Sequence, residues 1–302
     1  MKNTSNHFDV IIIGGSYSGL SAAMALGRSL RKVLILDSGT PCNAQTPHSH
    51  NFLTQDGKKP SEIASIALEQ VLKYDTVFFE KQKAIEATKT EKGFEISTES
   101  EIFFAKKLIL ATGIRDILPE IKGLKECWGI SVIHCPYCHG YEFRHQKTGI
   151  MANGERAYHL AGLIKNLTDD VTIFTNGKAE FTDEQFAKLS QNNIHVIEEH
   201  ILEIVHIQGK LSEIVMDDET SYPLIVLYAS LAFEQHTNIL EQLECDRTET
   251  GHIKIDTFQK ISVEGVFACG DNSSPMRSVA NAVFTGNVAG AMVNYDLTVE
   301  NF

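Results

Sequence analysis

Two cysteines stand three positions apart in the sequence, in Cys135-Pro136-Tyr137-Cys138. This spacing lowers the pKa of one of the two thiols, and the thiolate is the form that attacks a disulfide. His139 follows directly, and an imidazole with a pKa of about 6.5 suits proton transfer with thiols near neutral pH. We therefore predict that Cys135 and Cys138 form a redox-active pair, with His139 as its acid–base group.

Two other interpretations of the cysteine pair remain open, a zinc half-site and a structural coincidence. A zinc site needs two more ligands, and the flanking His134 and His139 are so close in the chain that local geometry disfavours convergence on one metal. His48 and His50 form a His-x-His pair in a stretch of turn-forming residues. We expect a polar loop there, with metal binding or a place near a cofactor as the alternatives.

The remaining cysteines do not suggest a disulfide framework. Six cysteines in 302 residues are too few for one, and a Cys-x-x-Cys pair in a reducing compartment indicates redox chemistry or metal binding. We expect packing roles for the four scattered cysteines, Cys42, Cys127, Cys245 and Cys269.

A glycine-rich turn near the N-terminus is typical of a dinucleotide site. The apolar run Phe8–Ile13 suits a parallel strand buried on both faces, and Gly14-x-Ser16-x-x-Gly19 follows it. The first glycine permits a tight turn, the middle position lets a pyrophosphate approach, and the third permits close packing of helix on strand. Ser16 replaces the usual middle glycine and can itself donate to a phosphate. Asp37 lies 23 positions after Gly14, a distance that suits binding of ribose hydroxyls.

The pattern strand–turn–helix–strand occurs twice, which predicts an α/β fold with two Rossmann-like domains. The two copies comprise the ranges 8–13, 20–30 and 32–36, and then 148–152, 155–167 and 171–175. Further strands are expected at 77–86, 94–98, 101–105, 107–110, 224–229 and 265–268, and helices at 61–74 and 279–295. A strand that ends in Gly270-Asp271 places an acid where it can bind the polyol of a flavin, although a plain strand-end turn looks the same.

Composition and charge exclude several classes of function. The chain has a mass of 33.5 kDa, enough for about two domains. Its net charge of -12 and the lack of a basic patch argue against nucleic-acid binding. The early apolar run is too short to span a bilayer, and no signal-peptide pattern is present. We expect a cytoplasmic protein that does not bind membranes.

Several motifs keep a family-specific order and spacing. They are the turn at Gly14, then Ala111-Thr112-Gly113, then Trp128-Gly129 ahead of the cysteine pair, and Gly270-Asp271 followed by Met276-Arg277-Ser278-Val279. Over essentially its whole length the chain resembles the low-molecular-weight thioredoxin reductases, which are flavin-dependent disulfide oxidoreductases.

The resemblance implies a discontinuous FAD-binding domain, residues 1–117 and 246–302. An NAD(P)-binding-like domain, residues 118–245, would be inserted in it and carry the cysteine pair. Cys138 would face the flavin, Cys135 would attack the substrate, and the protein would be a homodimer. The residues that the family pattern assigns to FAD are Gly14, Ser16, Gly19, Asp37, Thr112, Gly113, Gly270, Asp271 and Val279.

The sequence departs from the thioredoxin reductases at two places. His139 stands where they have Asp, and the block 135–142 together with 48–57 resembles a subgroup that includes the dithiol oxidases of gliotoxin and holomycin. The second glycine turn, at 151–157, keeps only Gly154 and Ala157, and Ala152 and Asn153 would crowd a pyrophosphate. Thr175-Asn176-Gly177 replaces the basic residues that grip the 2′-phosphate of NADPH. We therefore expect weak or no use of NADPH.

The main hypothesis is an FAD-dependent thiol–disulfide oxidoreductase of thioredoxin reductase type with a degenerate NADPH site. An oxygen-dependent dithiol oxidase is the first alternative, and a flavin-binding redox sensor is the second. The substrate is expected to be a small dithiol or a thioredoxin-like protein.

Overall fold

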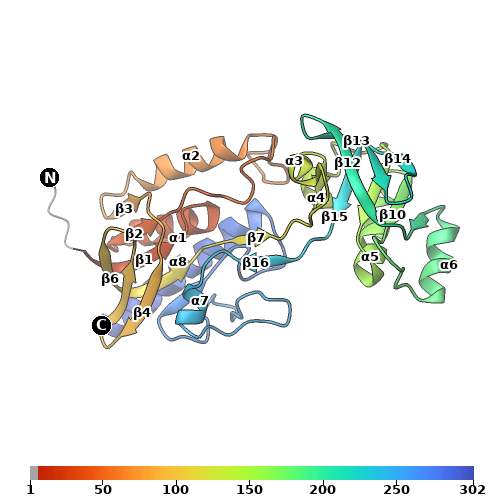
Figure 1. The fold of residues 1–302 in the computed structure, drawn as a ribbon. Helices are drawn as coiled ribbons and strands as arrows, with labels where there is room; N and C mark the ends of the chain where they lie inside the picture. The colour runs from red at the N-terminus through yellow and green to blue at the C-terminus, as the bar shows by residue number, and fades with distance from the viewer. Residues whose placement is uncertain (1–5) are drawn as a thin grey trace. The chain divides into compact units, whose positions relative to one another are not determined.

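The computed structural model describes residues 6–302. Contacts divide the chain into two compact units. Unit 1 contains the described residues up to Ala44 together with Phe52–Arg115 and Glu234–Phe302. Unit 2 contains Gln45–Asn51 and Asp116–Phe233. Unit 1 is thus assembled from both ends of the chain, and nearly all of unit 2 is one continuous insertion (Figure 1).

A seven-stranded sheet forms the centre of unit 1. Its strands are β1 (His7–Ile13), β2 (Val33–Leu36), β3 (Val77–Glu80), β4 (Glu86–Thr90), β5 (Gly93–Ser97), β6 (Ile102–Leu110) and β17 (Val266–Ala268). The order is β3-β2-β1-β6-β5-β4, with β17 also paired to β6. The pairs among β1, β2, β3, β6 and β17 are parallel, whereas β4–β5 and β5–β6 are antiparallel.

The parallel strands of unit 1 are mostly apolar, as expected for strands of a sheet that helices cover. All four residues of β2 are buried, and so are the last four of β1. The helices of the unit are α1 (Tyr17–Arg28), α2 (Pro60–Val71), the short α7 (Ile239–Gln242) and α8 (Val279–Asn301).

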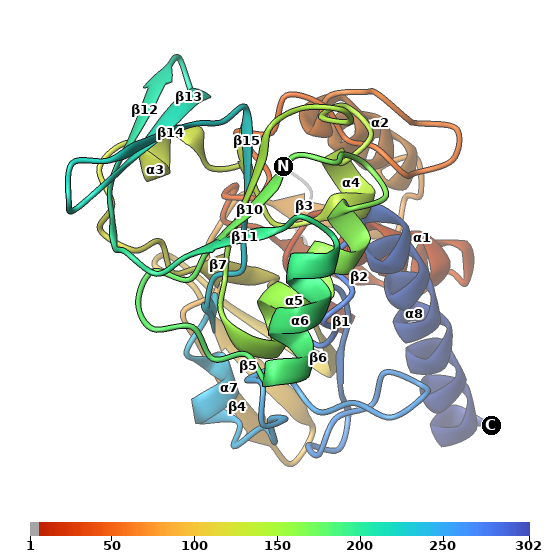
Figure 2. The ribbon, with the colours of Figure 1, turned by 90° about the vertical axis from the view of Figure 1, so that its right-hand side faces the viewer.

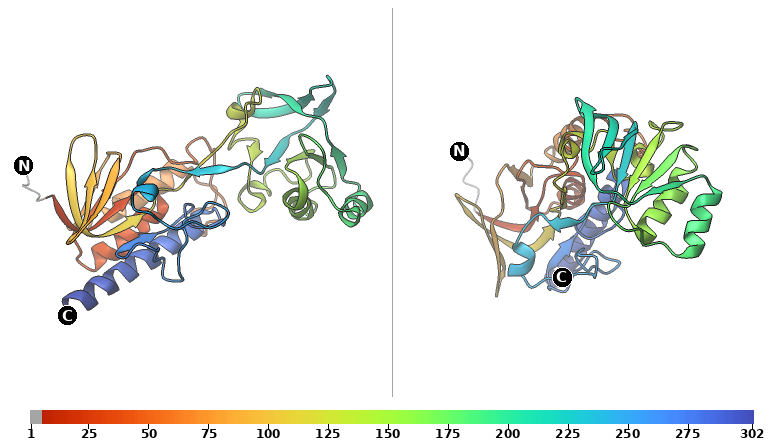
Figure 3. Two further views of the ribbon diagram at one scale, coloured as in Figure 1. Left: turned by 60° about the horizontal axis from the view of Figure 1, so that its bottom comes forward. Right: turned by 45° about the vertical axis from the view of Figure 1, so that its right-hand side comes forward.

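Helices α1 and α8 pack closely although they lie at opposite ends of the chain. Figures 1 and 3 show α8 (blue) alongside α1 (red). Small residues permit the approach: a methyl group built on Gly286 would overlap the carbonyl oxygen of Ser18, and Gly290 lies against Ala22 in the same way. The Ser21 hydroxyl donates to the Val283 carbonyl at 2.7 Å across the same contact.

Unit 2 is built on a five-stranded parallel sheet with the order β11-β10-β9-β15-β8. Its strands are β8 (Val132–Ile133), β9 (Thr148–Met151), β10 (Val171–Phe174), β11 (His195–Ile197) and β15 (Val226–Ala229). Helices α5 (Gly154–Ile164) and α6 (Asp183–Gln191) lie side by side next to this sheet (Figure 2). The expected α/β fold with two Rossmann-type domains is confirmed.

A second, antiparallel sheet of unit 2 is absent from the sequence-based prediction. It comprises β12 (Ile201–Ile207), β13 (Lys210–Met216) and β14 (Ser221–Pro223). Short helices α3 (Leu124–Cys127) and α4 (Pro136–His139) complete the unit. The chain passes between the units along β7 (Ile114–Asp116) and β16 (Phe233–Gln235), which pair with each other. Within residues 6–302, no helix combines the length and the hydropathy that crossing a membrane requires.

Candidate functional site

The turn between β1 and α1 is too tight for any side chain at Gly14. Gly14 has φ +109°, and a methyl group there would overlap the carbonyl oxygen of Ala111. Its N–H donates to the Leu36 carbonyl at 2.8 Å. A methyl group on Gly19 would overlap the carbonyl oxygen of Gly14 itself. Both glycines therefore let the first turn of α1 lie close against the ends of β1 and β6.

The N-terminus of α1 keeps its backbone donors available. Ser16 is the N-cap residue, and its side chain makes no capping hydrogen bond. The first turn of α1 also contains no acidic residue. Since the first N–H groups of a helix have no partner within the helix and carry positive partial charge, this end favours an anion such as a pyrophosphate.

Asp37 comes directly after β2 and is held by two backbone groups. Its Oδ1 accepts from the Gly15 N–H at 2.9 Å and its Oδ2 from the Gly39 N–H at 3.1 Å. A carboxylate oxygen has a further lone pair after accepting one such bond. Asp37 is thus fixed beside the turn and can still accept from ribose hydroxyls.

The ends of β6 and β17 bring the other predicted flavin residues together. Asn272 donates through Nδ2 to the Leu110 carbonyl at 2.8 Å and to the Thr112 hydroxyl at 3.2 Å. Gly113 has φ +64°, and a methyl group there would meet no atom within 4 Å. The Gly270 N–H donates to Thr285 of α8 at 3.1 Å.

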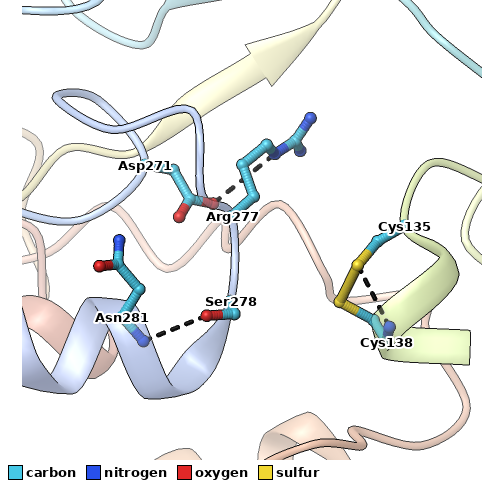
Figure 4. Close-up of a disulfide and its surroundings, with 6 residues drawn as sticks. All are labelled: Cys135, Cys138, Asp271, Arg277, Ser278 and Asn281. Atoms are coloured by element: carbon cyan, nitrogen blue, oxygen red, sulfur yellow. Dashed lines mark hydrogen bonds and ion pairs between the residues drawn. A yellow bond between two sulfur atoms is a disulfide. The ribbon is translucent and has the colours of Figure 1, made fainter. Parts of the chain in front are cut away.

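Figure 4 shows Asp271 and Arg277 on the loop between β17 and α8, where their side chains lie 3.8 Å apart. Ser278 caps this helix by accepting from the Asn281 N–H at 3.1 Å. Val279 is the first residue of α8 and packs against Tyr17 and Ala282.

These residues of unit 1 fit a flavin nucleotide. The uncapped helix N-terminus suits its phosphates, Asp37 suits its ribose, and the open space at Gly113 admits a further group. Asn272 adds an independent sign, because its Oδ1 is buried and accepts no hydrogen bond within residues 6–302. A buried acceptor without a partner is costly, so a ligand donor at this position would stabilise the site.

Cys135 and Cys138 form a disulfide in unit 2 (Figure 4). Cys135 is the N-cap residue of α4, and its Sγ accepts from the Cys138 N–H at 3.1 Å. The same bond would stabilise a Cys135 thiolate once the disulfide is reduced, because charge strengthens a hydrogen bond. Tyr137, between the two cysteines, has a side chain that is 69% exposed.

His139 belongs to a polar cluster with His50 and Glu142. The rings of His50 and His139 lie 6.3 Å apart edge to face, and His50 Nε2 lies 3.7 Å from Glu142 Oε1. Burial lowers the pKa of His139, His50 lowers it further, and Glu142 opposes them. His139 is therefore neutral at pH 7 and can accept a proton.

The sequence did not identify the roles of His50 and Glu142. The local sequence predicts only a polar loop around His50, and Glu142 is merely one residue of the block 135–142. No local pattern joins a residue of the 45–51 segment to α4, so only the fold reveals the cluster. His48 is exposed, with its ring 6.3 Å from that of His50. Among the described residues, no three His, Cys, Asp or Glu side chains are placed to hold a metal ion.

The scattered cysteines differ in their surroundings. Cys127 and Cys269 are buried, as packing residues should be. Burial raises the pKa of Cys269 to about 12, which keeps it an inert thiol. Cys42 is exposed, so the packing role expected for it is wrong; it lies in the turn-rich segment that follows β2.

Comparison with known proteins places this arrangement in a family. The family model described as pyridine nucleotide-disulphide oxidoreductase matches residues 8–286. The chain belongs to the pyridine nucleotide-disulphide oxidoreductase family.

Individual members of this family match over nearly the full chain. Thioredoxin reductase tcpT of Claviceps purpurea is 34% identical over 310 residues, covering 99% of this chain and 97% of the relative. An oxidoreductase from Agrobacterium tumefaciens is 38% identical with a TM-score of 0.91, covering 97% of this chain and 99% of that structure. A putative thioredoxin reductase TrxB from Bacillus anthracis is 32% identical with a TM-score of 0.92, covering 98% and 100%.

Within the pyridine nucleotide-disulphide oxidoreductases, this chain is of the low-molecular-weight thioredoxin reductase type. It is a flavin-dependent disulfide oxidoreductase. The resemblance inferred from the sequence motifs is thus confirmed.

Proposed function

We propose that the protein is an FAD-dependent thiol–disulfide oxidoreductase that works through Cys135 and Cys138. The observation that carries this proposal is the disulfide itself, with a backbone N–H on the Cys135 sulfur and a neutral imidazole next in the chain. A structural disulfide requires neither feature. Exchange chemistry requires both a stabilised thiolate and a proton acceptor.

FAD is the flavin that unit 1 is suited to hold. Gly14, Ser16 and Gly19 would place its pyrophosphate at the start of α1, and Asp37 would accept from its ribose. The other FAD-binding residues we propose are Thr112, Gly113, Gly270, Asp271 and Val279. When bound, the flavin supplies a two-electron acceptor or donor for the cysteine pair. From the sequence we propose residues 1–117 and 246–302 as the FAD-binding domain and residues 118–245 as the inserted domain; residues 234–245, which include α7, belong to unit 1 by their contacts.

The cysteine pair exchanges two electrons with the substrate in two steps. A substrate thiolate attacks Cys135 Sγ, the Cys135–Cys138 bond breaks, and Cys138 leaves as a thiolate. The second substrate thiol then attacks the mixed disulfide, which releases an oxidised substrate and a reduced cysteine pair. His139 takes a proton from a substrate thiol. Because every step is reversible, the same residues also reduce a disulfide when electrons arrive from the flavin.

The proposed substrate is a small dithiol or a thioredoxin-like protein, since relatives of similar length are named thioredoxin reductases. The family resemblance supports a homodimer as the working form, and the proposed location is the cytoplasm.

The test compares the wild-type flavoprotein with Cys135→Ser and Cys138→Ser. We expect both variants to retain the flavin, because none of the proposed FAD contacts involves either cysteine. We expect turnover of dithiothreitol or of thioredoxin to be lost in both. Full turnover in Cys135→Ser would refute the proposal.

An oxygen-dependent dithiol oxidase is the second candidate, and the altered turn at 151–157 favours it. Anaerobic mixing with a dithiol should bleach the flavin absorbance near 450 nm, and air should restore it. Slow turnover with every donor would instead support the third candidate, a redox sensor.

A further inference from the structure

The start of α5 in unit 2 corresponds to the start of α1 in unit 1, but its first backbone donor, the Gly154 N–H, is already taken. Asn153 is the N-cap residue of α5. Its Oδ1 accepts from the Gly154 N–H at 2.8 Å and from the Glu180 N–H at 2.9 Å. Its Nδ2 donates to the Lys178 carbonyl at 2.8 Å. Asn153 therefore ties the helix start to the segment that follows β10, whereas Ser16 leaves the start of α1 uncapped.

Carboxylates surround this helix start. Glu155 lies in the first turn of α5 and accepts from Gln185 at 2.8 Å. A methyl group built on Gly154 would lie 3.8 Å from Glu180 Oε2. Arg156, in the same turn, is exposed, and no hydrogen bond or ion pair holds it to the turn in the described chain. The nearest fixed charges thus repel a diphosphate.

The segment after β10 is likewise closed by its own bonds. The Thr175 hydroxyl donates to the Gly177 carbonyl at 2.6 Å, and Asn176 Oδ1 accepts from the Ile201 N–H at 2.8 Å. The Ala179 N–H donates to Glu198 Oε1 at 2.7 Å. The Glu198 carboxylate thus occupies the Ala179 N–H in the segment after β10, where binding of a 2′-phosphate would require a cation.

We propose that Asn153 and Glu180 close the nucleotide site of unit 2, so that this unit binds no pyridine dinucleotide. The residues do not fit the group that the family name implies. The inference deepens the proposed function and rests on it. Because unit 2 then binds no reduced dinucleotide, the cysteine pair must receive its electrons from a thiol substrate. That substrate is oxidised to a disulfide, and dioxygen is the class of acceptor that takes the electron pair and the protons.

The test measures binding of NADPH and of NADH to the purified flavoprotein by isothermal titration calorimetry. We expect wild-type Kd values weaker than about 1 mM. The double variant Asn153→Gly, Glu180→Gln should bind at least one dinucleotide about tenfold more tightly, equivalent to ~1.4 kcal/mol. Asn192→Gly, which removes the same side chain at the end of α6, is the matched control and should not gain affinity.

Wild-type binding of NADPH below about 10 µM, or rapid bleaching of the flavin by NADPH, would overturn the inference. A double variant that gains nothing would overturn the assignment to Asn153 and Glu180. The single variant Glu180→Gln keeps the N-cap residue Asn153, so it replaces the double variant in this test if the double variant is unstable. Turnover of dithiols in Cys135→Ser would refute the proposed function without changing these binding results, so the two failures are distinguishable.

Discussion

Replacing Gly286 with alanine should loosen the contact between α8 and α1 and weaken flavin binding. A methyl group at this position would overlap the carbonyl oxygen of Ser18 and lie 2.8 Å from its carbonyl carbon. Carbon atoms in contact are about 3.5–4.0 Å apart, so α8 would have to move by about 0.7 Å or more. Ser18 is in the first turn of α1, the turn that we propose holds the pyrophosphate.

The expected loss in free energy of unfolding of unit 1 is about 2 kcal/mol. Overpacking typically lowers the free energy of unfolding by about 1–3 kcal/mol. We take about 3 kcal/mol here, because the overlapping atom of Ser18 belongs to the backbone and cannot rotate away. The higher helix propensity of alanine relative to glycine adds back about 1 kcal/mol of stability. A net loss of about 2 kcal/mol lowers the Tm by about 4–8 °C for a unit of this size.

The fluorescence of the flavin that is released on heating reports the thermal unfolding of unit 1. The ratio of flavin to protein absorbance in the purified variant reports binding. Asn287→Ala is the matched control, because Asn287 is the next residue of α8 and is exposed. It should raise stability by up to about 0.7 kcal/mol through helix propensity. A Gly286→Ala protein as stable and as yellow as the wild type would refute this account of the packing.

Three further predictions concern unit 2. Because the pKa of His139 is lowered in the folded protein, this histidine takes up its proton in the unfolded chain first as the pH falls. The stability that this residue contributes should therefore decline only below about pH 6.5, as pH-dependent unfolding would show. Turnover, which needs the neutral imidazole, should likewise decline only below about pH 6.5 in a pH–rate profile. Glu142→Gln removes the charge that raises the pKa of His139, so the acid limb of the pH–rate profile should move to lower pH; a limb that moves the other way would contradict the cluster. Ser131→Ala should lower the free energy of unfolding by about 1–3 kcal/mol, because the buried hydroxyl donates to the Gly209 carbonyl at 2.6 Å and accepts from the Leu211 N–H at 2.9 Å. Urea unfolding monitored by the fluorescence of Trp128, the single tryptophan, measures this loss.

The repeated strand–helix–strand units could be predicted because their strands are continuous apolar runs. The predicted helix 20–30 begins earlier in the structure, at Tyr17, because the N-cap Ser16 lies within the glycine turn itself. It ends at Arg28, and Leu30 beyond it has φ +57°. Intrinsic patterns thus located the elements, while capping set their bounds.

Other elements also carry local sequence signals. Helix α6 has a capping box, with Thr182 and Gln185 bonded to each other's backbone, and this pattern is visible in the sequence. The hairpin of β12 and β13 turns at Gln208 and Gly209, both with positive φ. Glutamine is a weak signal there, since asparagine is usual in such a turn.

The polar cluster beside the disulfide could not be predicted by any local rule. His50 and His139 are 89 positions apart, and each alone is an ordinary histidine. For Asn153, by contrast, the sequence predicts an obstacle to a pyrophosphate but not the three hydrogen bonds of its side chain. Two of them reach the segment after β10, whose position relative to α5 depends on the packing of the sheet.

The assembly of unit 1 from both ends of the chain has a consequence for biosynthesis. The Ser21–Val283 bond joins residues 262 positions apart, so α1 waits for its partner helix until the chain has been synthesised beyond Val283. The long insertion Asp116–Phe233 emerges from the ribosome before α8, as a continuous piece, and can form its sheet during synthesis. Flavin capture is then a late event, and a nascent chain stalled before α8 should carry the cysteine pair but no colour.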